Sequence, residues 1–206
     1  MAAKPADAID VALLVARAIE SAFGAYFIGG SVASSFQGEP RATNDIDVVL
    51  ELPLGRIHAF VSALGPDFEV DVDMLRDALL HGRTCNIFFL PLVTKIDLFA
   101  VGPSPFDQIE FARRKPIAVR PTGETLVLKT PEDTVIRKLL WYREGGEVSS
   151  RQWRDIVEVL RVSGPSMDHA YLTSWGNRLG ISDLLARAQV DAGFLGSLCP
   201  DRRATC

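Results

Sequence analysis

Residues 25–52 are the stretch of this chain that most restricts its fold. An apolar run that ends at Ile28 is followed by the small residues "GGSVASS", then by a loop rich in Gly and Pro, and then by the alternating run "DIDVVLEL". These patterns predict a strand, a turn, a helix and a second strand in close succession. The segment therefore predicts a domain in which helices and strands are mixed.

The second of these strands carries two aspartates that are two residues apart. Residues two apart in a strand point to the same face, about 6.6 Å apart along the chain, so Asp45 and Asp47 project together while Ile46, Val48 and Leu50 face the core. Neighbouring carboxylates repel each other unless they are solvated or share a cation, and hard oxygen ligands suit Mg2+. A solvated strand edge is the plainer interpretation of the spacing.

The glycines before the first helix provide a second feature. Gly29 and Gly30 would let the backbone approach a ligand, and Ser31 with the amides of the helix start would face an anion. An ordinary strand-to-helix turn accounts for the same residues, and a glycine pair by itself is weak support for a binding site.

A third acid lies in the apolar run "VTKIDLFAV", where Lys95 and Asp97 share one strand face. A carboxylate inside such a strand is costly unless it is paired or bound to a metal, so an ion pair with Lys95 or with a neighbouring strand is the alternative. Asp71 and Asp73 repeat the spacing of the first pair without a glycine turn upstream. We expect Asp73 to cap the next helix and Asp71 to lie exposed at the end of a strand.

The rest of the chain divides into a mixed half and a helical half. Helices are predicted over residues 54–65 and 74–82, a strand over residues 67–72, and two strands that turn at Leu90 and Pro91. From Pro131 onward, four helical segments are separated by Gly, Ser and Pro; they cover residues 131–146, 149–162, 167–180 and 181–196. Pro131 followed by two acids is a favourable helix start. We therefore expect an α+β fold, with a mixed sheet flanked by helices in residues 1–125 and a helical bundle in residues 126–206.

Bulk composition limits the ligands and the cellular locations that suit the protein. The net charge of -4 over 206 residues argues against capture of a long nucleic acid by overall charge. Asp10, Arg17 and Glu20 interrupt the apolar run of residues 8–23, and none of the later apolar runs is long enough to span a membrane. The cysteines are Cys85, Cys199 and Cys206, and their spacing is typical neither of a metal site nor of a disulfide-rich domain. This indicates a reducing environment and no structural zinc, so we expect a cytoplasmic protein that does not bind a membrane.

Taken together, the acids and the glycine turn resemble a known signature. The run Gly29-Gly30-Ser31, an interval of 13 residues, Asp45-Ile46-Asp47 and the later Asp97 are similar to the motif of the nucleotidyltransferase superfamily, which has the polymerase-beta-like fold. The wording "RATNDID" also resembles the Arg-x-Thr-x-Asp-x-Asp pattern of its bacterial members. The resemblance covers roughly residues 24–100.

The helical half shows a further resemblance. Residues 131–160 are similar to the helical part of the AbiEii-type nucleotidyltransferases, some of which are toxins of toxin-antitoxin pairs. In that family a Lys-Leu step and an Arg-x-x-Arg-Asp step complete the site; here these are Lys138-Leu139 and Arg151, Arg154 and Asp155. Solvated charges on a helix surface are the alternative reading of these residues.

The resemblance implies a transferase that moves a nucleoside monophosphate from ATP or another NTP to an acceptor hydroxyl. Asp45, Asp47 and Asp97 would be catalytic and would bind Mg2+, with Mn2+ as a substitute, since two such ions activate the hydroxyl and neutralise the phosphates. The residues implied to bind the nucleotide are Gly29, Gly30, Ser31, Arg41, Lys138, Arg154 and Asp155.

The acceptor is open at this level. The AbiEii-type resemblance favours RNA such as tRNA, or a protein, and implies an antitoxin as a partner. The acidic net charge instead favours a small or cationic acceptor such as an aminoglycoside. A module that binds a nucleotide or a partner protein without catalysis is the alternative outside the enzymes.

Overall fold

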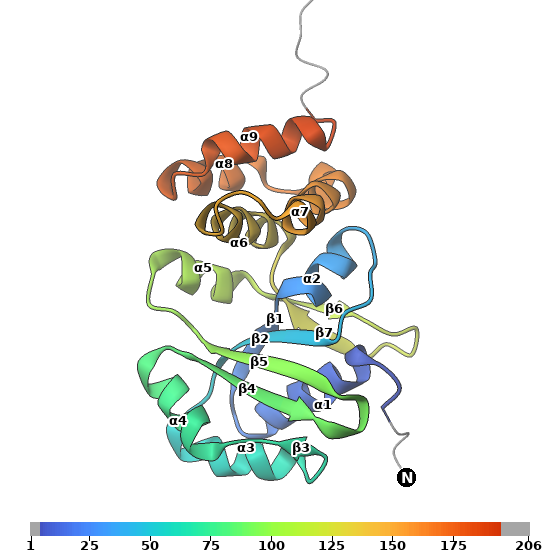
Figure 1. Ribbon diagram of the computed structural model, residues 1–206, viewed down its shortest axis with the longest axis vertical. Helices are drawn as coiled ribbons and strands as arrows, with labels where there is room; N and C mark the ends of the chain where they lie inside the picture. The colour runs from blue at the N-terminus through green and yellow to red at the C-terminus, as the bar shows by residue number, and fades with distance from the viewer. Residues whose placement is uncertain (1–4, 195–206) are drawn as a thin grey trace, which may run out of the picture. The chain divides into compact units, whose positions relative to one another are not determined.

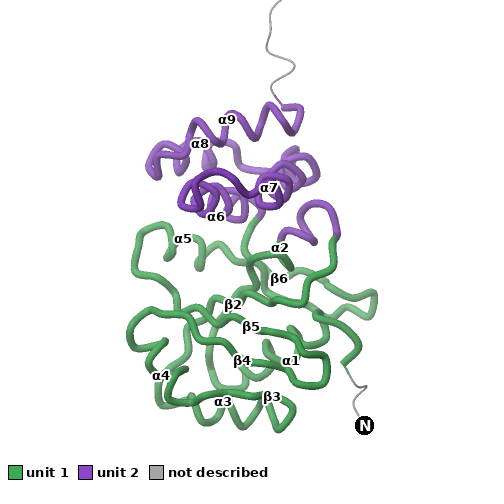
Figure 2. Tube along the Cα trace, viewed as in Figure 1, with its two compact units in different colours: residues 1–33, 41–130 green, residues 34–40, 131–206 purple. Residues whose placement is uncertain are grey.

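The computed structural model describes residues 5–194 of the chain (Figure 1). The described part divides into two compact units, coloured separately in Figure 2: unit 1 comprises residues 5–33 and 41–130, and unit 2 comprises residues 34–40 and 131–194. The chain passes from unit 1 to unit 2 at Thr130, whereas the sequence pattern places the boundary at residue 125. Residues 34–40 belong to the helical unit, which the pattern does not indicate.

Unit 1 is built on a seven-stranded mixed sheet with the order β3-β4-β5-β2-β1-β7-β6. The β2–β5 and β1–β7 pairs are parallel, and the other pairs are antiparallel. This confirms the expected mixed sheet. The strands are β1 Ala25–Ile28, β2 Asp45–Glu51, β3 Phe68–Glu69, β4 Thr84–Phe89, β5 Thr94–Ala100, β6 Lys115–Ala118 and β7 Thr125–Leu128.

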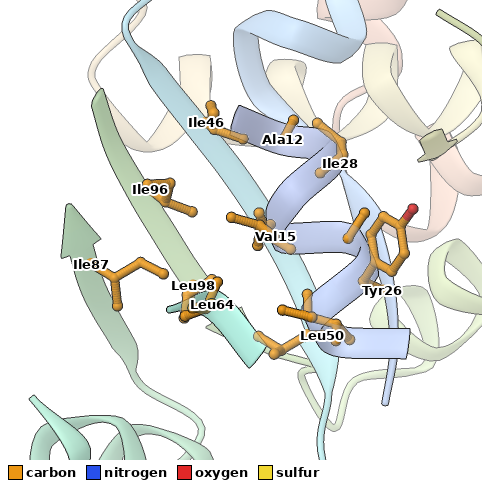
Figure 3. Close-up of a cluster of buried hydrophobic side chains, with 14 of the residues drawn as sticks. Ala12, Val15, Tyr26, Ile28, Ile46, Leu50, Leu64, Ile87, Ile96 and Leu98 are labelled. Carbon is orange, nitrogen blue, oxygen red and sulfur yellow. The ribbon is translucent and has the colours of Figure 1, made fainter. Parts of the chain in front are cut away.

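Helices α1 and α3 pack with one face of this sheet around the main core (Figure 3). Alternate residues of the central strands point into it, and Ile46, Leu50 and Ile96 are each at most 1% exposed. Burial of each such side chain contributes about 1.5–3 kcal/mol. The helices of unit 1 are α1 Ala8–Ser21, α3 Ile57–Leu64, α4 Val72–His81, α5 Pro105–Arg113 and the first residues of α2 Gly30–Gln37.

The local sequence explains why α1 takes this place. Asp7 caps the helix by accepting the N–H of Asp10, which satisfies one of the amides that lack a partner in the first turn. Val11, Val15 and Ile19 follow at a spacing of four and are fully buried, so they form the stripe that packs on the core.

The opposite face of the sheet carries the acids. Phe27 of β1 points to this face, where the centroid of its ring lies 5.9 Å from the ring centroid of Phe111 on α5. On β2 and β5 the same face presents Asp45, Asp47 and Asp97, because each alternates with a buried residue.

Unit 2 contains the helices that the second half of the sequence predicts. Each begins close to its expected position, and α6 starts at Pro131. Among residues 5–194, no helix has both the length and the apolar character needed to cross a membrane. The helices are α6 Pro131–Glu144, α7 Ser150–Ser163, α8 His169–Arg178 and α9 Ser182–Asp191, and the expected residues 195 and 196 of the last segment lie outside the described residues.

Two expectations about the region around the start of α4 are wrong. Asp71, and not Asp73, caps α4: its carboxylate accepts the N–H groups of Asp73 and Met74, and the helix begins at Val72. The strand expected over residues 67–72 is only Phe68–Glu69: its pairing with β4 ends at Glu69, opposite Phe88, because the chain turns into α4 at Val72.

The cysteines divide between the described and undescribed parts of the chain. Cys85 is a buried free thiol on β4, and burial raises its pKa. Cys199 and Cys206 lie outside the described residues. The sequence pattern also leaves α5, β6 and β7 unassigned, although Ser104 and Asp107 form a capping box at the start of α5.

Candidate functional site

The parallel pairing of β2 with β5 brings the acids together. Asp47 lies directly opposite Asp97, and Asp45 lies opposite Lys95. Adjacent strands are about 4.8 Å apart, so the Asp47 and Asp97 side chains leave neighbouring backbones on the same face of the sheet. Asp45 is exposed and Asp47 is half-buried, while Ile46 between them is fully buried, which confirms the predicted alternation.

The glycine turn lies against Asp47. The N–H of Gly29 donates to the Asp47 carbonyl at 2.8 Å, which ties the turn to β2. Gly30 has a φ of +52°, and a Cβ at this position would lie 1.7 Å from Asp47 Oδ2. The hydroxyl of Ser31 accepts a hydrogen bond from the Arg41 guanidinium. The structure therefore places Gly29 and Gly30 against Asp47 and joins Ser31 to Arg41.

Gly30→Ala is expected to abolish the function of this site because the new methyl group would displace the Asp47 carboxylate. Rotation of the Asp47 side chain can move its oxygens away, but its Cβ would still lie 3.1 Å from the new atom. An Ala with a left-handed backbone costs about 1–2 kcal/mol of stability. The loss of activity should be far larger than this loss of stability can explain.

The matched control is Gly82→Ala. Gly82 also has a left-handed backbone, with a φ of +63°, but a Cβ there meets nothing within 4 Å. Denaturant melts and activity assays of both variants separate backbone strain from the clash. Equal activity in the two variants would show that the contact between Gly30 and Asp47 is unimportant.

A lysine lies within the group of acids. Lys95 Nζ is 2.8 Å from Asp97 Oδ2, so the ion pair considered as an alternative for Asp97 is present. The hydrogen bond from Lys95 to Asp97 raises the pKa of Lys95, and the charges of Asp45 and Asp47 act in the same direction. The other oxygen, Asp97 Oδ1, is buried and has no hydrogen-bond partner within the described part of the chain.

Behind the turn lies a buried ion pair that sequence reasoning missed. Lys129 Nζ is 3.2 Å from Glu110 Oε1, and the two side chains are only 3% and 5% exposed. A Cβ on Gly29 would lie 3.7 Å from Lys129 Cε, so the lysine packs directly against the turn. The available signal was a lysine that follows the apolar strand "TLVL" without a break.

Comparison with known proteins gives the fold. No family model and no curated protein matches the sequence. Among solved structures, the chain is similar to an antigenic nucleotidyltransferase-like protein from Paracoccidioides brasiliensis, with a TM-score of 0.55 and 17% identity over 91% of this chain and 95% of that one. The chain has the nucleotidyltransferase fold. The antibiotic-resistance factor ANT(2'')-Ia is also similar, with a TM-score of 0.50 and 14% identity over 90% of this chain and 96% of that one.

This nucleotidyltransferase fold raises the question of whether its acids suit a metal ion. Between residues 5 and 194, no group of three or more His, Cys, Asp or Glu side chains is placed to hold one. The donor chemistry nevertheless fits Mg2+, which binds through one or two carboxylates and completes its shell with substrate phosphates and water. Asp97 Oδ1 is a buried carboxylate oxygen of the kind such an ion needs. The residues thus fit an ion that arrives with a nucleotide better than an all-protein cage.

The candidates from the helical half lie in unit 2. Lys138 Nζ is 2.8 Å from Asp155 Oδ2, and the two side chains are 6% and 10% exposed. Arg154 pairs with Glu39 at 2.5 Å on the surface, and this hydrogen bond raises its pKa, whereas Arg151 is exposed. The structure brings Lys138 and Asp155 together as a buried pair. Their role toward a nucleotide stays a prediction, as does the AbiEii-type assignment.

Proposed function

We propose that the protein transfers a nucleoside monophosphate from an NTP to an acceptor hydroxyl in a Mg2+-dependent reaction. The observation that carries this proposal is the register of β2 and β5, which sets Asp47 beside Asp97 with Asp45 on the same face. The glycine turn in contact with Asp47 supports it, because a helix start is a favourable place for phosphate groups.

Each residue has a distinct task in this proposal. The acceptor oxygen forms a bond to the α-phosphorus, the bond from that phosphorus to the β-phosphate oxygen breaks, and pyrophosphate leaves. Asp45, Asp47 and Asp97 would hold Mg2+, which when bound neutralises phosphate charge and lowers the pKa of the acceptor hydroxyl. Asp97 also accepts the proton of that hydroxyl.

The remaining candidates bind the nucleotide. The amides at the start of α2, together with Ser31 and Arg41, hold the outgoing phosphates, since a guanidinium and a helix start both favour anions. The nucleotide-binding role that the resemblance gives to Lys138, Arg154 and Asp155 belongs to the same proposal.

The acceptor class has two candidates. RNA such as tRNA, or a protein, is the first, because the helical half resembles AbiEii-type enzymes, and an antitoxin would then be a partner. A small cationic hydroxyl compound such as an aminoglycoside is the second, supported by the net charge of -4 and by the likeness to an antibiotic-resistance factor.

The direct test is to incubate the protein with each labelled NTP, Mg2+ and one acceptor class at a time: total tRNA, lysate protein or aminoglycosides. We expect label to move to one class with release of an equal amount of pyrophosphate. Absence of transfer to every class, with intact NTP binding, would instead support the non-catalytic nucleotide-binding module.

Nucleotide affinity is expected to depend on the metal. Calorimetric titration with NTP should give an affinity at least roughly tenfold lower in EDTA than in Mg2+ at matched ionic strength, because the carboxylates repel triphosphate that carries no ion. Equal affinities under the two conditions would contradict the metal-dependent site.

A further inference from the structure

Lys95 faces acids along its own strand and on the neighbouring strand. Asp97 lies two residues further along β5 on the same face and binds the ammonium at 2.8 Å. Asp45 lies opposite Lys95 on β2. On the other side, β4 places Phe88 opposite Lys95 and Asn86 opposite Asp97, so that strand adds no charge at these two positions.

The two members of the ion pair differ in how readily they can move. The Asp97 side chain is 14% exposed and lies in the middle of β5, between the buried residues Ile96 and Leu98. The Lys95 side chain is 39% exposed and has a flexible four-carbon stem, so its ammonium can turn to solvent at little cost. If a second cation approaches Asp97, the lysine is the group that moves.

We propose that Lys95 is an internal counter-ion that competes with the metal ion for Asp97. The inference rests on the proposed function, since it concerns the same three acids. An ammonium within hydrogen-bond distance of Asp97 occupies a carboxylate oxygen and repels a divalent cation, so the ion must displace it. Lys95 therefore lowers the affinity of the site for a bare ion, and it acts as a positioning residue rather than a catalytic one.

The test is Mn2+ binding without nucleotide, followed by electron paramagnetic resonance, in Lys95→Met, Lys95→Arg and the wild type. Met keeps the apolar stem and removes the charge, so we expect Mn2+ to bind roughly fivefold more tightly to Lys95→Met. Lys95→Arg should stay close to the wild type because the cation is kept. The control is Lys115→Met, which removes an exposed lysine from the edge strand β6 and should change nothing.

The sign of the effect decides the inference. A lysine that only supports the geometry of Asp97 would give weaker Mn2+ binding when removed, so weaker or unchanged binding in Lys95→Met overturns the proposal. Asp47→Asn separates this outcome from a failure of the proposed function. If Asp47→Asn does not weaken Mn2+ binding, the metal site itself is wrong; if it does and Lys95→Met is not tighter, only the inference fails.

A measurement on the wild type covers the case in which Lys95→Met does not fold. Acylation of lysine amines, read by mass spectrometry, should become faster at Lys95 relative to Lys115 when Mn2+ is added, because the displaced side chain leaves Asp97 and turns to solvent, where the reagent reaches it. A ratio that does not change with Mn2+ at concentrations that fill the site would overturn the proposal.

Discussion

Asp47→Asn is expected to lower the rate of nucleotidyl transfer by at least about a thousandfold and to leave the fold intact. The amide keeps the shape of the side chain but loses the negative charge beside Asp97, and the proposed binding of a divalent ion depends on that charge. Stability should be equal or slightly higher, because removing one of several neighbouring carboxylates relieves their repulsion.

The control for this variant is Asp73→Asn. Asp73 belongs to the other pair of aspartates with the same spacing, but it lies exposed in the first turn of α4 and has no place in the proposed site. Transfer rates at saturating NTP and melting temperatures should be measured for both variants. A rate for Asp47→Asn within tenfold of the wild type would rule out the catalytic assignment of these acids.

Lys129→Met is expected to reduce the free energy of unfolding by about 3–5 kcal/mol, because it leaves the Glu110 carboxylate buried without the ammonium that neutralises it. The double variant Lys129→Met/Glu110→Gln should recover part of the loss, since no uncompensated charge then remains. The sequence alone offers no reason to expect so large an effect from this lysine.

Urea unfolding followed by circular dichroism is the suitable measurement, because the ion pair lies in unit 1 while Trp141, Trp153 and Trp175 all lie in unit 2. Arg17→Met is the matched control: its ion pair with Glu124 has a similar length of 3.3 Å but exposed side chains, so the expected loss is below about 1 kcal/mol. A loss for Lys129→Met no larger than that of the control would show that the buried charge is compensated in another way.

The sequence by itself determined the features that depend on local geometry. Alternation of side chains in a strand fixed that Asp45 and Asp47 share one face while Ile46 is buried. A proline in the first turn placed the start of α6 at Pro131. Asp71 is the instructive error: either aspartate of its pair can cap a helix, and only the end of the β3–β4 pairing decided where the helix begins.

The tertiary structure alone decided which residues meet. Alternation gives the face of Asp97 but not its neighbour, and the register that sets it opposite Asp47 depends on how two distant strands pair and pack. The buried pair of Lys129 and Glu110 joins the residue after β7 to α5 in the same way. For Asp97, an ion pair and a metal ion satisfy the same need to neutralise a carboxylate in an apolar strand, so only the position of the Lys95 ammonium showed that the pair forms.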